Sequence, residues 1–194
     1  MKRSSLFRAL DGYEKLSQDF FAQFAEEETL NRMRSFAEAH PNCLDRENLD
    51  GHFTASAFIL SPDRKKVVLT FHAKIQKWMQ LGGHADGHPL MHEVAMREAE
   101  EESGLSGLSF FFSEEEPLPF DLDIHLIAAH KGVPEHHHYD LRYLLLCKDE
   151  SKVRISDESL DLKWIELDQI SSYTQESSVL RQVQKSNILT AKTL

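Results

Sequence analysis

The sequence predicts an α/β domain preceded by a helical segment. Three observations support this prediction: β-rich runs at residues 52–60 and 66–72, a helical pattern at residues 90–103, and a helical region at residues 4–39. Strands that alternate with helices along the chain are typical of α/β folds. A length of 194 residues suits one such domain with a substantial core. Further strands are expected at residues 120–129, 136–143 and 160–165, and a further helical pattern at residues 167–191.

Composition and charge exclude several classes of protein. The chain is 41% hydrophobic and 28% charged, and it lacks an apolar run near the roughly 20 residues that span a bilayer, so we expect no membrane partner. Its net charge of −10 argues against nucleic-acid binding by the protein alone, because phosphates repel an acidic surface. Cys43 and Cys147 show no metal or redox spacing, and no secretory signal is evident. A cytoplasmic protein with reduced thiols is therefore expected.

Residues 1–45 are predicted to form a helical extension, and residues 46–194 the main domain. Apolar residues recur at helical spacing through residues 4–39, and the acidic cluster at residues 26–28 indicates a break between two helices. The second helix should end at His40, because Pro41 disfavours helical geometry in the residue before it. We expect these helices to pack on the domain rather than to form a dimer surface, although a homodimer is compatible with the sequence.

The most informative stretch is residues 82–105, a glycine-rich loop followed by the helical pattern. The apolar positions of this helix fall on the same face as Glu98 and Glu102, and Glu101 lies at the edge of that face. Burying an unpaired carboxylate costs several kcal/mol, so an ordinary amphipathic helix keeps such groups on its opposite face. The pattern therefore indicates a bound divalent cation, because Mg²⁺ and Mn²⁺ prefer carboxylate oxygens. A solvated acidic face is the disfavoured alternative.

The loop and the helix together resemble the Nudix box, G-x5-E-x7-R-E-U-x-E-E-x-G-U, in which U is aliphatic. Gly83 matches the first glycine, and residues 97–105 match the second half at the right spacing. Pro89 departs from the box, because it stands where the family has its first glutamate. In the family that glutamate helps to fix the box arginine, and Glu93, four residues before Arg97, is a candidate for this role. The departure bears on catalytic efficiency more than on fold or metal binding.

The resemblance covers about residues 50–170 and implies a Nudix-type α/β/α sandwich with a mixed sheet. It implies hydrolysis of a phosphoanhydride by water attack on phosphorus, with Mg²⁺ or Mn²⁺ as the cofactor. The substrate would be a nucleoside diphosphate linked to another moiety, or a related organic pyrophosphate. The implied metal ligands are Glu98, Glu102, Glu101 and the carbonyl of Gly82. Arg97 would orient the carboxylates, and Glu101 or Glu158 would be the general base.

Two other functions are known for this fold. A catalytically weak Nudix-type ligand-sensing module would agree with the loss of a box residue at Pro89. An isoprenyl diphosphate isomerase would need a catalytic cysteine, and neither Cys43 nor Cys147 lies in a similar motif. The intact box carboxylates favour hydrolysis over both alternatives.

Polar and apolar residues alternate in two of the expected strands. Asp121, Asp123 and His125 share one side of the first, and residues 136, 138, 140 and 142 share one side of the second. Antiparallel pairing could bring the two polar sides together. This face is either a substrate-side surface or a structural hydrogen-bonded network, and a transition-metal site is less favoured, because the spacing lacks the closed pattern of structural zinc. The substrate-side candidates are His84, His125, His136, His138 and Asp140.

Overall fold

The computed structural model describes residues 3–130, 132–150, 153–155 and 159–192. The helices of these residues, with short π or 3-10 turns marked η, are α1 (Ser4–Leu16), η1 (Ser17–Phe21), η2 (Ala22–Phe24), α2 (Glu27–Ala39), α3 (Met91–Ser103), η3 (Leu167–Gln169), α4 (Ile170–Tyr173) and α5 (Ser177–Lys192). The strands are β1 (Gly51–Leu60), β2 (Lys66–His72), β3 (Trp78–Met79), β4 (Leu81–His84), β5 (Ser109–Phe110), β6 (Asp121–Ile127), β7 (His136–Leu146) and β8 (Ser159–Glu166).

The described strands form one mixed, 8-stranded sheet around a parallel pair, β1 and β7. The main path runs β3-β2-β1-β7-β5, with β4 paired to β1, β6 to β7 and β8 to β2. One edge of β1 therefore pairs with β7, while its other edge pairs with β4 and, at Leu60, with β2. Every residue of β1 is buried, as expected for a strand that is covered on both faces.

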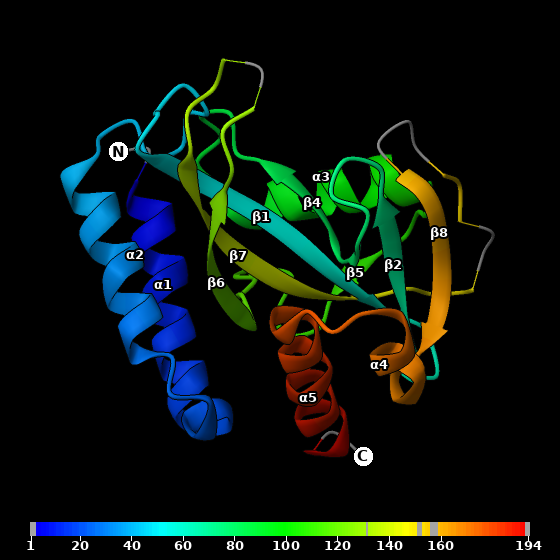
Figure 1. The fold of residues 1–194 in the computed structure, drawn as a ribbon. Helices are drawn as coiled ribbons and strands as arrows, with labels where there is room; N and C mark the ends of the chain where they lie inside the picture. Colours follow the sequence, from blue (N-terminus) through cyan, green and yellow to red (C-terminus); the bar gives the residue numbers. More distant parts are fainter. Residues whose placement is uncertain (1–2, 131, 151–152, 156–158, 193–194) are drawn as a thin grey trace.

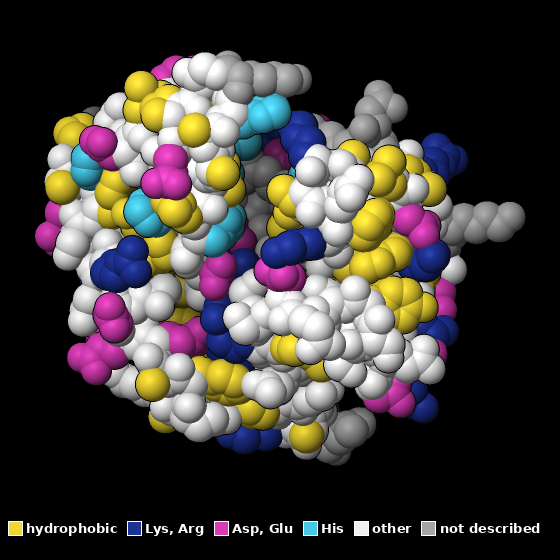
Figure 2. All heavy atoms as spheres, in the orientation of Figure 1, with side chains coloured by type: hydrophobic (Ala, Val, Ile, Leu, Met, Phe, Trp, Pro, Cys, Tyr) yellow, Lys and Arg dark blue, Asp and Glu magenta, His cyan; other side chains and the backbone are white. Residues whose placement is uncertain are grey.

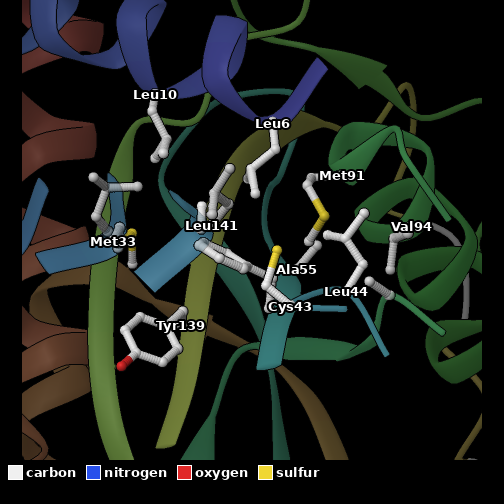
Figure 3. Packing of buried hydrophobic residues seen from close by; sticks show 14 of the residues in the cluster. Leu6, Leu10, Met33, Cys43, Leu44, Ala55, Met91, Val94, Tyr139 and Leu141 are labelled. Atoms are coloured by element: carbon white, nitrogen blue, oxygen red, sulfur yellow. The ribbon is translucent and has the colours of Figure 1, made fainter. Parts of the chain in front are cut away.

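Helices cover both faces of the sheet. In Figure 1, α3 lies behind the sheet and α5 lies in front of it. Figure 3 shows side chains of α1 and α3 gathered over the central strands, with Leu6 and Leu10 close to Leu141. Residues of α5, including Val179 and Leu189, belong to a second cluster on the sheet. The predicted α/β fold with a mixed sheet and a helical N-terminal segment is confirmed.

The N-terminal helices share their core with the sheet. Leu6, Leu10 and Met33 are fully buried in the cluster that contains Leu141 of β7. The break between the helices falls at Ala25, whose φ of 50° is left-handed, and α2 then ends before His40, as proline at the next position predicts. The division of the chain at residue 45 stays a prediction. None of the described helices is long and apolar enough to cross a membrane.

Candidate functional site

The loop from β4 to α3 positions the box residues. Strand β4 ends at His84, and α3 begins at Met91, one residue after the predicted start. Pro89 lies before the helix, where its missing N–H costs no helical hydrogen bond. Gly104 ends the helix with a φ of +67°, a left-handed geometry that glycine adopts without strain. The predicted helix and its end are therefore confirmed.

Glu98 lies directly against the glycines of β4. Its side chain is only 14% exposed, and a Cβ atom at Gly83 would lie 2.5 and 2.6 Å from its two carboxylate oxygens. A glycine is thus required for Glu98 to approach the strand so closely. At Gly82 a side chain would clash with a different group, because a Cβ there would lie 2.7 Å from the backbone oxygen of Ala55 in β1.

Arg97 joins two of the box carboxylates. Its guanidinium lies 3.0 Å from an oxygen of Glu98 and 3.5 Å from an oxygen of Glu101, the second at the predicted spacing of one helical turn. Glu93 instead lies 3.3 Å from Nε2 of His88. The hypothesis that Glu93 replaces the missing box glutamate is therefore not supported, because its carboxylate faces the loop rather than Arg97. Glu98 and Glu102 are half-buried, as their helical positions predict, whereas Glu101, which was expected to point inward with them, is exposed.

The polar sides of β6 and β7 meet as the alternation predicts. In the antiparallel register, His125 faces His138, Asp123 faces Asp140 and Asp121 faces Arg142. The parallel register of β1 with β7 adds a third row of polar side chains, from β1, to this face. The alternation within β6 and β7 does not predict this row. The residues of β1 on this face are His52 beside His138, Thr54 beside Asp140 and Ser56 beside Arg142. Four adjacent strands, β4, β1, β7 and β6, thus build one polar face.

One end of this face is a buried ionic network centred on Arg142, which is 2% exposed. Its guanidinium lies 2.8 Å from Asp140, 3.1 Å from Asp123 and 3.2 Å from Asp121. Asp140 also accepts hydrogen bonds from Ser56 and Thr54. This geometry does not support the expected place of Asp140 beside a substrate, because both of its oxygens are used inside the protein.

The network continues into the helices. Lys185 of α5 is fully buried, 2.7 Å from Asp121 and 2.5 Å from Glu26, and Arg181 lies 2.8 Å from Asp121. The Tyr13 hydroxyl of α1 donates to Glu26 and accepts from Lys185. Burial opposes ionisation of Asp121, but Lys185 and Arg181 outweigh it and hold the pKa of this carboxyl below its ordinary value. At this end of the face the structural interpretation is the appropriate one.

The other end of the face is a cluster of histidines from β1, β4 and β7. The ring centroids of His52 and His138 are 4.7 Å apart, those of His52 and His84 are 5.0 Å apart, and those of His84 and His138 are 5.1 Å apart. Burial lowers the pKa of His84 to about 4 and that of His138 to about 2, so both rings are neutral near pH 7. Figure 2 shows histidine side chains beside a hollow in the molecular surface.

His125 and His136 lie around this cluster. Nδ1 of His125 is 3.2 Å from a carboxylate oxygen of Asp123, and Nδ1 of His136 is 2.9 Å from the carbonyl oxygen of Pro134. One nitrogen of each ring is therefore held by the protein, which fixes the ring orientation.

Comparison with known proteins assigns the family. The model of the NUDIX domain matches residues 51–184. The chain belongs to the Nudix family. Its predicted class, a Nudix pyrophosphohydrolase, is thereby confirmed at the level of the family. A search of curated proteins gives no match.

Solved structures with a similar fold include three hydrolases. A hydrolase of the NUDIX family from Clostridium perfringens is 26% identical with a TM-score of 0.56, covering 71% of this chain and 97% of its own. An Ap4A hydrolase from C. elegans is 16% identical with a TM-score of 0.52, covering 73% of this chain and 96% of its own. The E. coli dihydroneopterin triphosphate pyrophosphohydrolase is 17% identical with a TM-score of 0.52, covering 69% and 92%. The last two similarities show the fold alone.

The Nudix box of this chain suits a hard divalent cation. Glu98 and Glu102 lie one turn apart on α3, both half-buried, and Gly83 leaves room for the Glu98 carboxylate beside β4. Carboxylate oxygens are the donors that Mg²⁺ and Mn²⁺ prefer. Glu158, the other general-base candidate, lies outside the described residues.

Proposed function

We propose that this Nudix protein hydrolyses a phosphoanhydride in a nucleotide or a related organic pyrophosphate, with Mg²⁺ or Mn²⁺ as the cofactor. One observation carries the proposal: Glu98 and Glu102 are half-buried on one side of α3, and Arg97 joins Glu98 to Glu101. Two of the similar structures named above act, by their titles, on different compounds, Ap4A and dihydroneopterin triphosphate, so we transfer neither substrate. A cytoplasmic location is also proposed, in agreement with two free cysteines.

In the proposed mechanism, Glu98 and Glu102 would hold the metal, together with Glu101 and the carbonyl of Gly82. When bound, such a cation neutralises the phosphate oxygens and lowers the pKa of a coordinated water. Arg97 keeps Glu98 and Glu101 in register through its two ion pairs. The carboxylate of Glu101 is 62% exposed, which leaves it accessible to an attacking water as general base.

The histidines remain part of this proposal as substrate-side candidates. His84 directly follows the box glycine Gly83, and His125, His136 and His138 lie on the same polar face. The rings of His84 and His138, whose pKa values burial lowers, can each donate a hydrogen bond to a phosphate or sugar oxygen without carrying charge.

The cysteines argue against isomerase chemistry. Cys43 is fully buried, and burial raises the pKa of its thiol to about 11. Cys147 is also buried, and its thiol donates to the carbonyl oxygen of Asp149 at 2.8 Å. A catalytic cysteine needs an accessible sulfur that can ionise or transfer a proton, and neither residue offers one.

Phosphate release from a panel of nucleoside diphosphate derivatives, measured with Mg²⁺ or Mn²⁺, tests the proposal. We expect turnover with at least one compound and a loss of about 100-fold or more in Glu98→Gln, since a lost metal ligand removes transition-state stabilisation. Glu100→Gln is the matched control, because Glu100 is an exposed residue of the same helix. Full activity in Glu98→Gln would refute the site, and metal-dependent binding of a nucleotide without turnover would indicate a ligand-sensing module.

A further inference from the structure

We propose that His52, His84 and His138 form a second metal site, which binds a nitrogen-preferring transition ion such as Zn²⁺. Each histidine offers one ring nitrogen, and these three atoms all lie within 4.8 Å of one another. Imidazole suits zinc and similar ions, whereas the box carboxylates suit Mg²⁺ or Mn²⁺. The proposal goes beyond the hydrolytic function, because it gives His84 and His138 a metal ion away from the box in place of the substrate contact considered above.

The sheet brings the three histidines together. His52 of β1 lies beside His138 of β7 in the parallel register. His84 of β4 pairs with Thr54, two residues after His52, and residues two apart in a strand share one face. The three rings therefore come from three adjacent strands and point to the same side, so their positions are fixed by backbone hydrogen bonds.

The spacing of the nitrogens is close to that of an occupied site. Zn–N bonds of about 2.0–2.1 Å at tetrahedral angles place ligand nitrogens roughly 3.4 Å apart. Nitrogens within 4.8 Å of one another reach that spacing by small rotations of the side chains. Three protein ligands would leave a fourth position for water or another ligand, as in zinc sites that bind small molecules.

The buried nitrogens lack other partners. His52 is 2% exposed, and neither of its ring nitrogens has a hydrogen-bond partner among the described residues. Burial lowers the pKa of His52 and the nearby backbone of Asn48 opposes this shift, but the two groups do not meet with the geometry of a hydrogen bond. Nε2 of His138 is also buried without a partner. A buried polar group without a partner is destabilising, and a metal ion that accepts one lone pair from each ring would relieve part of this cost.

The surroundings of the cluster agree with this site. His136 lies with its ring centroid 5.1 Å from that of His52, and Pro134 holds its Nδ1. Metal-binding sites commonly have an outer layer of residues that are oriented in this way by backbone carbonyls.

The two metal sites lie on opposite faces of β4. Gly83 pairs with Ala55, whose side chain belongs to the core under α3, and Glu98 approaches Gly83 from that side. His84, the next residue, points to the other face because side chains alternate along a strand. A variant can therefore remove one site while leaving the donors of the other in place.

Metal titration of the untagged full-length protein tests the proposal. Chelator-stripped protein would be titrated with Zn²⁺ by calorimetry and with Co²⁺ by visible absorption, in excess Mg²⁺ to occupy the box. We expect one ion per chain, with tetrahedral Co²⁺ bands, and affinity weakened by more than about 100-fold in His52→Ala, His84→Ala and His138→Ala. His137→Ala and Glu98→Gln are the controls that should keep the ion, since His137 lies on the other side of β7.

Three results would overturn the second site: no stoichiometric ion in the wild-type protein, undiminished affinity in all three histidine variants, or loss of the ion in Glu98→Gln. The first would indicate a network bridged by water, and the last would place the ion at the box. Circular dichroism of each variant separates loss of metal from loss of fold. If His52→Ala does not fold, His84→Gln and His138→Gln decide the question, because both side chains are only partly buried.

Discussion

At the scale of single residues, the neighbouring glycines Gly82 and Gly83 have different structural roles. Gly83 gives room to the carboxylate at the end of the flexible Glu98 side chain, whereas Gly82 gives room to the backbone of β1. A side chain can move aside at little cost, but a paired strand cannot. Substitution by alanine should therefore lower activity at Gly83 and stability at Gly82.

We expect Gly83→Ala to lower metal-dependent turnover by about 10-fold or more, with a small change in melting temperature, because the new Cβ displaces a metal ligand. Gly82→Ala should lower the melting temperature clearly, because its Cβ meets β1. Thermal unfolding and kcat, measured on both variants, check this pair. Equal losses of stability would contradict the distinction.

Glu93 provides a second test at this scale. Since Glu93 contacts His88 and not Arg97, Glu93→Ala should change kcat by less than about 2-fold, as exposed ion pairs contribute only about 0–1 kcal/mol. Arg97→Ala should lower kcat more strongly, because it releases Glu98 and Glu101. A large loss in Glu93→Ala, partly rescued by Pro89→Glu, would restore the original hypothesis.

At the scale of elements, periodicity located most helices and strands but not their full extent. The predicted strand at residues 120–129 is shortened to β6, Asp121–Ile127, and the helical pattern at residues 167–191 is divided into η3, α4 and α5. The division falls at Thr174, whose extended φ and ψ of −144° and 146° end α4. The ionic network joins α5 to the N-terminal segment through Lys185, Glu26 and Tyr13.

Lys185→Met should destabilise the protein by about 3–5 kcal/mol, because it removes the fully buried one of the two cations that Glu26 and Asp121 share and leaves only the partly exposed Arg181. Denaturant-induced unfolding measures the loss. Lys15→Met, an exposed lysine of α1, is the matched control and should change stability by less than about 0.5 kcal/mol. Adding Glu26→Gln to Lys185→Met should recover part of the loss, and strict additivity of the two changes would argue against a coupled network.

At the scale of the whole molecule, the polar face crosses the sheet from the ionic network to the histidine cluster. It connects the N-terminal helices, four strands and α5, so its charges bear on global stability. The pKa of Asp121 is lowered in the folded protein by Lys185 and Arg181 against the effect of burial. Glu26 has the opposite sign, since its burial outweighs Lys185 and raises its pKa.

The lowered pKa of Asp121 predicts how acid affects stability. A carboxyl whose folded-state pKa is depressed stabilises the fold fully above its unfolded pKa of about 4, and this contribution is lost as the pH falls through the folded pKa. The free energy of unfolding should thus fall steeply below about pH 4 in the wild-type protein and less steeply in Asp121→Asn. Chemical unfolding between pH 3 and 7, roughly the range in which carboxyls titrate, measures both slopes. Asp19→Asn, an exposed aspartate, should keep the wild-type slope.

The sequence by itself determined the α/β class, helix α3 with its glycine end, and the helical positions of Glu98, Glu101 and Glu102. These features depend on local spacing along one element, which the order of residues records directly. It also determined which residues of β6 and β7 share a polar side.

Only the tertiary structure decided what these side chains meet. His52 joins His84 and His138 because β1 runs parallel to β7, and Thr54 reaches Asp140 across 86 positions of sequence. The tertiary structure also decides that Asp140 pairs with Arg142 and that Glu93 pairs with His88. The pairing of distant strands depends on the packing of the whole core. No local pattern in the sequence therefore specifies which strands become neighbours.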